Sequence, residues 1–142
     1  MGSDTELVAR LKAVPLLQDL SRAELKRVVA AGKERTHPSE HSIVRQGELG
    51  VGLHIILEGQ ADVIINGRRR SKLGPGDHFG EIAVIDGGVR MATVTAVSEM
   101  RTFSITSWAF LSLVTKNPSL ARKVMLALCA MLRQRGGLDA AT

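Results

Sequence analysis

One hairpin in the middle of the chain limits the folds open to it. Residues 61–65 (Ala-Asp-Val-Ile-Ile) have the composition of a strand, and residues 68–73 follow as a returning strand. Asn66-Gly67 lies between them and is the strongest short hairpin signal in the sequence, because both residues tolerate the positive φ of a tight turn. The chain is therefore predicted to contain an antiparallel sheet centred on this turn.

Further short strands, separated by glycine-containing turns, surround the hairpin. Their regular spacing is typical of a β-sandwich or jelly roll. The chain has no Gly-x-Gly-x-x-Gly motif and no strand–helix alternation, so a dinucleotide-binding fold is not expected. We predict a mainly β protein, an antiparallel β jelly roll (double-stranded β-helix) with flanking helices. The further strands are expected at 43–44, 53–57, 93–97 and 100–105.

Helices are expected before the strands. Apolar residues recur at helical spacing from Leu7 to Val14, and Pro15 ends this pattern. Ser21 and Glu24 form a capping box, which predicts that a second helix starts there and runs until Gly32. The N-terminal helices are therefore assigned to residues 1–33.

Two helices are also expected after the strands. Thr106 or Ser107 can cap a helix over 108–114, with Trp108 in the core. Asn117-Pro118 is the pattern of an N-cap followed by proline at the first helical position, so the last helix is predicted at about 118–135. The whole chain, 1–142, is predicted to be one domain, with a β-roll at 34–105 and C-terminal helices at 106–136.

The last helix carries two sets of apolar residues. One set can pack on the roll, and the second indicates either a broad core face or a further partner, such as a ligand or another subunit. Cys129 belongs to the second set and is expected to be a buried small hydrophobe. The first set is Leu120, Val124, Ala127, Leu128 and Met131; the second is Met125, Cys129 and Leu132.

Composition narrows the class of protein. A hydrophobic fraction of 44% is enough for one core, and the net charge of +5 permits attraction to anions. Aromatic residues do not interleave with the basic ones, which favours a solvated basic surface and a small-anion site over nucleic-acid binding. A single cysteine, no signal-peptide pattern and no apolar run of about 20 residues predict a cytoplasmic protein without a membrane span.

Residues 79–94 contain the chemistry of an anion site. Gly80 allows close approach of a ligand, and the amides that open a helical turn at 81–85, including that of Ala83, attract an anion. Arg90 brings a fixed charge and a planar fork of donors that suits phosphate oxygens. Glu81 would be repelled by phosphate and is expected to accept hydrogen bonds from a hydroxyl. A cyclic phosphate fused to a ribose with a free 2′-hydroxyl meets both demands.

This stretch closely resembles the phosphate-binding cassette of cyclic nucleotide-binding domains, which occur in the catabolite activator family and in cAMP-dependent kinase regulatory subunits. The matching residues are Phe79-Gly80-Glu81-Ile82-Ala83 and Arg90-x-Ala92-Thr93-Val94. Residues 44–48 and 54–63 are similar to that family's first strands and glycine turns. The resemblance implies a regulatory sensor and not an enzyme.

The resemblance also implies roles for individual residues. Glu81 would hold the ribose 2′-hydroxyl, while Arg90 and the Ala83 amide would hold the phosphate. Gly80, Ile82 and the backbone of Met91 would complete the wall. The predicted ligand-binding set is Phe79, Gly80, Glu81, Ile82, Ala83, Arg90, Met91 and Ala92. Catalytic residues, metal ligands and cofactors are not expected, and histidines 37, 41, 54 and 78 do not form a metal-binding set.

Two residues depart from the family pattern. Val89 stands where the family often has proline, and Met91 stands where Ala, Ser or Thr is usual. A threonine at the latter position favours cGMP in the family, so its absence favours cAMP, with cGMP as the second candidate. The alternative is a ligand-free module for dimerisation or docking, in which Glu81 and Arg90 form an ion pair in an empty cassette.

Signalling and partners are expected to involve the terminal helices. In the family the last helix closes over the base, and Arg133 and Arg135 are the candidates for base contacts. A homodimer through this helix and a downstream effector protein are the expected partners. No helix-turn-helix unit follows the last helix, so DNA binding by this chain alone is not expected. Arg68 to Arg70 form either a solvated hairpin tip or a contact for an acidic partner or nucleic acid. His78 is expected to be a surface or turn residue and not a ligand.

Overall fold

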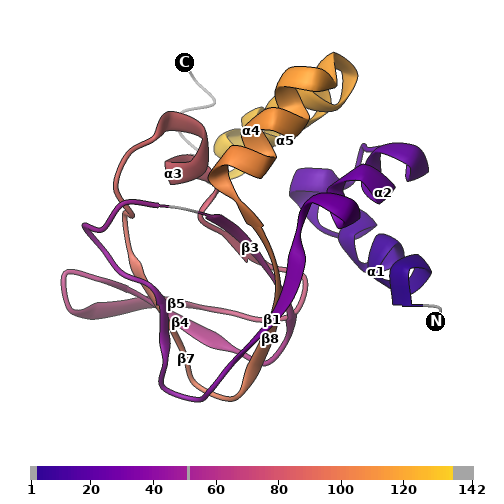
Figure 1. The fold of residues 1–142 in the computed structure, drawn as a ribbon. Helices are drawn as coiled ribbons and strands as arrows, with labels where there is room; N and C mark the ends of the chain where they lie inside the picture. The colour runs from indigo at the N-terminus through magenta and orange to yellow at the C-terminus, as the bar shows by residue number, and fades with distance from the viewer. Residues whose placement is uncertain (1–2, 51, 136–142) are drawn as a thin grey trace. The chain divides into compact units, whose positions relative to one another are not determined.

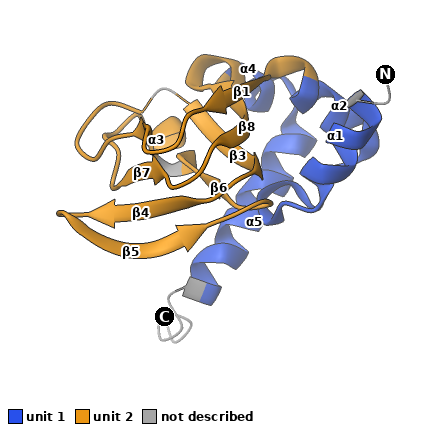
Figure 2. Cartoon of the chain, turned by 90° about the horizontal axis from the view of Figure 1, so that it is seen from below, with its two compact units in different colours: residues 1–29, 112–142 blue, residues 30–111 orange. Residues whose placement is uncertain are grey.

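The computed structural model describes residues 3–50 and 52–135, apart from the side chains of Ser3, Ile82 and Arg135. The chain divides into two compact units, residues 1–29 with 112–142 and residues 30–111 (Figure 2). The assignment of all 142 residues to one domain stays a prediction.

The elements in Figure 1 are α1 (Ser3–Lys12), η1 (Pro15–Leu17), α2 (Arg22–Ala31), β1 (Lys33–His37), β2 (Ser42–Val44), β3 (Gly52–Glu58), β4 (Ala61–Ile65), β5 (Arg68–Leu73), β6 (His78–Phe79), α3 (Glu81–Asp86), β7 (Thr93–Ala96), β8 (Met100–Thr106), α4 (Ser107–Lys116) and α5 (Pro118–Arg135).

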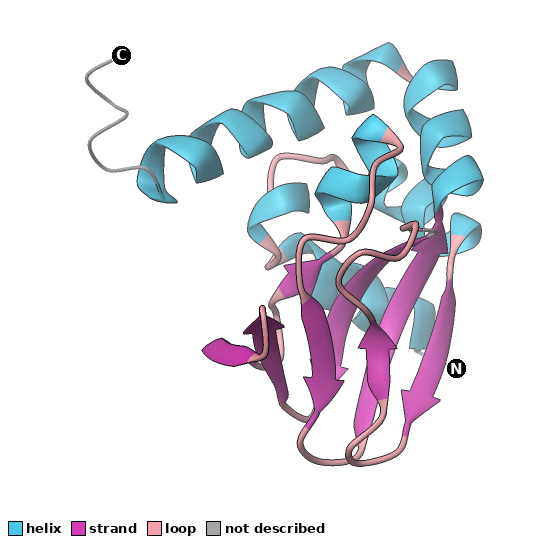
Figure 3. Ribbon diagram, turned by 90° about the vertical axis from the view of Figure 1, so that its left-hand side faces the viewer, coloured by secondary structure: helices cyan, strands magenta, loops and turns pink. Residues whose placement is uncertain are grey.

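Residues 30–111 form the predicted jelly roll. Among the described residues of this unit, one sheet has the strand order β1-β8-β3-β6 and a second has the order β2-β7-β4-β5. Figure 3 shows these strands in magenta. All the pairings are antiparallel. Strands β1 and β6 were not predicted individually. Lys-Glu-Arg-Thr-His in β1 is exposed except at its last residue, and β6 has only two residues, so neither has the apolar alternation that reveals a strand.

The Asn66-Gly67 hairpin is confirmed. Asn66 and Gly67 have φ of 53° and 78°, the positive values that this turn requires. The side chain of Gln46 holds the turn from a neighbouring loop: its Nε2 donates to Asn66 Oδ1 at 2.9 Å, and its Oε1 accepts from the Asn66 amide at 2.8 Å. The position of the hairpin tip is therefore set by a second segment as well as by its own backbone.

Small and aliphatic side chains fill the inside of the roll. Ala61 and Ala96 are fully buried on paired strands of the second sheet, and Ile56 and Met100 face them from the first. These residues alternate with outward-facing ones, as expected where two sheets pack face to face. The remaining members of this core are Val44, Phe79 and Val94.

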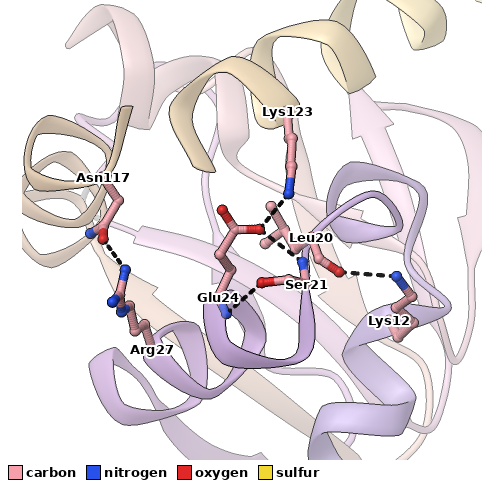
Figure 4. A network of polar contacts seen from close by, with 7 residues as sticks. All are labelled: Lys12, Leu20, Ser21, Glu24, Arg27, Asn117 and Lys123. Carbon is pink, nitrogen blue, oxygen red and sulfur yellow. Dashed lines mark hydrogen bonds and ion pairs between the residues drawn. The ribbon is translucent and has the colours of Figure 1, made fainter. Parts of the chain in front are cut away.

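The capping box at Ser21 is confirmed in the helical unit (Figure 4). The Ser21 amide donates to Glu24 Oε1 at 2.8 Å, and the Glu24 amide donates to Ser21 Oγ at 3.1 Å. Lys123 on α5 donates to the same carboxylate oxygen at 2.8 Å. This hydrogen bond and that of the Ser21 amide lower the pKa of Glu24 to about 2. The cap thus joins α2 to α5 through one ionised side chain.

Asn117 precedes α5 as predicted, but its side chain has other partners. Its Nδ2 donates to the Leu113 carbonyl at 2.7 Å, and its Oδ1 accepts from Arg27 (Figure 4). The Asn117 carbonyl accepts from Ala121 at 2.9 Å, which begins the helical pattern. The residue therefore holds the end of α4 with its amide group and opens α5 with its backbone.

Two predicted core positions are wrong, and both errors follow from helical phase. Cys129 is exposed, because Ala127 faces the core and a shift of two residues turns a helix by about 200°. Trp108 is 70% exposed for the same reason, since Phe110 supplies the buried face of α4. Met125 and Leu132 of the second apolar set on α5 are also exposed. A single broad core face on α5 is thereby excluded.

Glu24 should make stability depend on pH. Its folded pKa of about 2 lies below the ordinary 4.5, so its contribution is present above pH 4.5 and is lost as pH falls toward 2. Urea denaturation of wild type and Glu24→Gln should give a difference in unfolding free energy that is largest near pH 7 and shrinks between these values. Glu6→Gln, an exposed change on α1, is the control. A constant difference across this range would contradict the role of the charge.

Candidate ligand-binding site

The cassette begins at a glycine that no other residue could replace without strain. Gly80 joins β6 to α3 with φ of 95°, a left-handed conformation that favours glycine. A Cβ at this position would lie 2.4 Å from Arg90 Nη1 and 2.6 Å from the Gly52 carbonyl oxygen. At the other end of α3, the Gly87 amide donates to the Ala83 carbonyl at 3.0 Å and ends the helix. Both the backbone angle and the space require glycine at position 80.

A neighbouring loop holds the backbone of Arg90 in place. The Arg90 amide donates to the Glu48 carbonyl at 2.7 Å, and the Arg90 carbonyl accepts from the Gly47 amide at 2.9 Å. Leu49 and Val89 form an antiparallel bridge beside these bonds. These bonds fix the backbone of Arg90 through both its amide and its carbonyl. They form even though Val89 stands where the family often has proline.

The Arg90 guanidinium is buried and bonded to two backbone carbonyls. The residue is 5% exposed; Nη2 donates to the Gly52 oxygen at 2.7 Å and Nη1 to the Gly80 oxygen at 3.3 Å. Burial lowers the pKa of Arg90, while the charge of Glu81 raises it. A guanidinium has five N–H donors, and these two bonds to described residues use two of them. The group is thus prepared to donate to an anion.

Glu81 lies beside this cation without forming an ion pair with it among the described residues. Its side chain is buried, and its Oε1 is 3.7 Å from His78 Nε2. The prediction that His78 is a surface or turn residue is wrong, because it lies in β6 and its side chain is only 7% exposed. His78 and Glu81 are three residues apart across the turn at Gly80, which brings both side chains inward.

The other predicted site residues differ in exposure. Ala83 and Phe79 are buried, and the Phe79 ring belongs to the core of the roll. Ala92 is half-buried, whereas Met91 is 64% exposed. The backbone of Ile82 lies in α3, and its side chain is outside the described part of the structure.

The predicted base contacts belong to the other unit. Arg133 is exposed on α5, and the side chain of Arg135 is outside the described part of the chain. The pair Gly136-Gly137, a sequence typical of a helix end, is also outside the described residues. The ligand roles of all these residues stay predictions.

Sequence reasoning missed three residues that shape the site. A Cβ on Gly50 would lie 2.4 Å from the Ala83 Cβ and 3.0 Å from Arg90 Nε. Gly52 supplies the carbonyl that receives Arg90, and His54 stacks on Phe79 with ring centroids 5.1 Å apart. Gly50 and Gly52 were a signal in the sequence that could have indicated this part of the site, since nearby glycines are typical of close backbone approach.

Comparisons with known proteins identify the family. A family model, the cyclic nucleotide-binding domain, matches residues 34–117. A cyclic nucleotide-gated potassium channel of Rhizobium etli is 36% identical over 88% of this chain and 34% of its own length. The chain belongs to the cyclic nucleotide-binding domain family, as its resemblance to the phosphate-binding cassette predicted.

Solved structures agree with this assignment. The catabolite activator protein of Thermus thermophilus aligns with a TM-score of 0.76 and 28% identity, covering 89% of this chain and 62% of that one. The regulatory domain of a Toxoplasma gondii cAMP-dependent kinase, crystallised with cAMP, aligns with a TM-score of 0.72 and 29% identity over 79% of this chain and 44% of that one. The chain spans about a third of the length of the channel and only part of the two solved chains.

Two further findings concern membranes and metals. None of the helices within residues 3–50 and 52–135 is long and apolar enough to cross a membrane. Across the same ranges, no group of three or more His, Cys, Asp or Glu side chains is placed to hold a metal ion.

Two effects require glycine at position 80: the strain of a left-handed backbone and the lack of space for a Cβ. Two substitutions separate them. Gly76 has φ of 91° and open space where a Cβ would lie, so Gly76→Ala should cost only the strain of the left-handed backbone, about 1 kcal/mol. Gly80→Ala adds the clash with Gly52 and should cost about 1–3 kcal/mol more. Chemical denaturation of both variants measures the difference. Equal losses would mean that the cassette has room for a side chain here.

Proposed function

We propose that this chain is a cyclic nucleotide sensor that prefers cAMP to cGMP and signals through its terminal helices. The observation that carries the proposal is the buried Arg90 guanidinium beside the buried Glu81. A buried cation is costly, and its two carbonyl partners compensate with dipoles and not with a full charge. A phosphate anion would supply that charge and accept hydrogen bonds from the guanidinium.

Glu81 gives the proposed site its second requirement. The carboxylate is acceptor-only when ionised and would repel a phosphate placed directly on it. It would instead accept a hydrogen bond from a hydroxyl of the same ligand. A cyclic nucleotide carries a single phosphate and a free 2′-hydroxyl at a fixed separation, because the phosphate ring is fused to the ribose. The neighbouring positions of Glu81 and Arg90 support this ligand class.

The preference for cAMP is inferred from position 91. The hydroxyl that favours guanine in the family is absent, because Met91 has only a weakly accepting thioether sulfur. The exposure of Met91 is compatible with contact to either purine, so the inferred preference rests on the missing hydrogen bond and not on exclusion of guanine.

Signalling is proposed to pass through α5 and the residues after it. Arg133 and Arg135 are the proposed base contacts, and closure requires that the ligand bind the closed arrangement better than the open one. The exposed apolar residues of α5, Met125 and Leu132, are where a second copy of the chain or an effector protein would pack.

The alternative function is a module of the same fold that binds no nucleotide and serves dimerisation or docking. Two observations favour it: Arg90 already has two carbonyl partners, and the second apolar set of α5 is exposed. The ion pair between Glu81 and Arg90 that this alternative assumed is absent among the described residues. Thermal denaturation separates the two functions, because a ligand that binds only the folded state raises its melting temperature.

Arg90→Ala tests the phosphate contact. Loss of two charged hydrogen bonds should weaken cAMP binding by roughly 2–4 kcal/mol, about 30- to 1000-fold. Calorimetric titration with cAMP and cGMP measures this effect and the purine preference together. Arg22→Ala, which removes an exposed arginine from α2, is the matched control and should leave both affinities unchanged. Equal affinities for wild type and Arg90→Ala would reject the site.

Glu81→Gln tests the hydroxyl contact. A hydrogen bond to a charged acceptor contributes about 1.5–3 kcal/mol, so this variant should bind cAMP about 10- to 150-fold more weakly. 2′-Deoxy-cAMP lacks the donor and should bind wild type and variant with similar affinity. If the substitution weakened both nucleotides equally, Glu81 would act on the fold of the cassette and not on the ribose.

A further inference from the structure

A second hollow lies on the first sheet of the roll, outside the predicted cassette residues. It has a volume of about 590 Å³ and is bounded by β1, the start of β3, the end of β8 and the first turn of α4. This volume is in the range of small-molecule sites. Polar, charged and aromatic side chains line it: Lys33, Arg35, His54, Ser104, Thr106 and Trp108.

Strand register explains why polar side chains gather there. Lys33 pairs with Ser104, and Ser104 pairs on its other side with His54, so these three residues form one row across the sheet. Arg35 is two residues after Lys33 and therefore faces the same side. Glu34 faces the opposite side, where it forms an ion pair with Arg101. Glu34, the carboxylate between the two cations on β1, therefore lies on the other face of the sheet.

Hydrogen bonds order the floor of the hollow. His54 Nδ1 lies 2.7 Å from Ser104 Oγ, which lies 3.1 Å from Thr102 Oγ1, and Thr102 Oγ1 lies 3.0 Å from His37 Nε2. Burial, with the charge of Arg90 as a smaller cause, lowers the pKa of His54 to about 3, so its ring is neutral at pH 7. The ring also stacks on Phe79. The floor is therefore rigid, neutral and able to form hydrogen bonds.

The rim carries the charge. Lys33 and Arg35 are exposed, and neither has an ion pair with any other residue that the structure describes. Two unpaired cations two residues apart on a strand raise the local concentration of anions. Arg35 adds a planar fork of donors that suits phosphate or carboxylate.

Trp108 supplies an aromatic surface at the same hollow. It lies in the first turn of α4, where Thr106 Oγ1 accepts the Ala109 amide at 3.3 Å and so fixes the start of the helix. Its 70% exposure is unusual for the largest apolar side chain and leaves a ring face available for stacking. A ring stacked on Trp108 could place an attached anion near the cationic rim.

We propose that this hollow is a second binding site, for a small anion that carries a planar aromatic ring. Lys33 and Arg35 would hold the anionic group, Trp108 would stack on the ring, and Ser104 and His54 would form hydrogen bonds at the floor. The site does not depend on nucleotide binding by the cassette. Gly52 belongs to both regions, since it lines the hollow and its carbonyl accepts from Arg90.

The chain provides its own probe for this site. Trp108 is the single tryptophan, and there is no tyrosine, so intrinsic fluorescence reports on the hollow alone. Titration with phenyl phosphate should change this fluorescence to saturation. Inorganic phosphate carries only the anionic group and benzyl alcohol only the aromatic ring. Each should bind at least about tenfold more weakly than phenyl phosphate. Equal binding of benzyl alcohol would overturn the proposal, because it would show apolar adhesion only.

Matched variants test the rim. Lys33→Gln and Arg35→Gln should each weaken phenyl phosphate binding about three- to tenfold. Lys72→Gln and Arg70→Gln remove the same charges from exposed positions on β5 and should have no effect. Trp108→Leu, followed by calorimetry, should reduce binding similarly. All five positions are exposed, and unchanged melting temperatures would verify that the variants fold.

The final comparison separates this site from the cassette and from a protein-docking surface. Glu81→Gln, at a cassette residue that does not line the hollow, should leave phenyl phosphate affinity unchanged, and Lys33→Gln should leave cAMP affinity unchanged. Competition between phenyl phosphate and cAMP, with loss of both in Arg90→Ala, would overturn the proposal by locating the anion in the cassette. Binding of an oligoglutamate peptide in the absence of phenyl phosphate binding would overturn it in favour of an acidic protein partner.

Discussion

The site depends on one buried guanidinium. Arg90 reaches the carbonyls of Gly80 and Gly52 only because both segments approach it without side chains, and Gly50 provides the same clearance at Nε. Its backbone is bonded on both sides to the loop at Gly47 and Glu48. Segments that are distant in the sequence are therefore arranged around a single cation. Burying that charge has an electrostatic cost, which the carbonyl dipoles offset only in part.

Local signals predicted the parts of the fold that local chemistry determines. Asn66-Gly67 and the Ser21–Glu24 box each depend on a few neighbouring residues, and both formed as expected. The cassette was recognised because its spacing places glycine, carboxylate and arginine around one turn. Strand β1 was missed because its charged residues lie at a sheet edge, where pairing and not burial defines the strand. Hydrophobic periodicity in a sequence reports burial, so it gives no sign of a strand that is defined only by its pairing at a sheet edge.

The errors at single residues have a common cause. Trp108 and Cys129 were assigned to the core from residue type, and both are exposed because Phe110 and Ala127 set the inward face of their helices. Asn117 precedes α5 as predicted, and its side-chain amide bonds to Leu113 one turn earlier and to Arg27 on α2. His78 was placed at the surface, and the turn at Gly80 directs it inward toward Glu81. Residue type gives a preference, whereas orientation depends on the packing of the whole element.

The two bonds from Arg90 to carbonyl oxygens have a consequence for how the domain would respond to a ligand. They satisfy part of the guanidinium with groups of the chain itself, so the fold alone fixes the position of the arginine. If the domain binds a nucleotide as proposed, the arginine itself would need no folding step, and the rate would be set by encounter and by the proposed closure of α5. The same two bonds would hold the arginine again after release of the ligand.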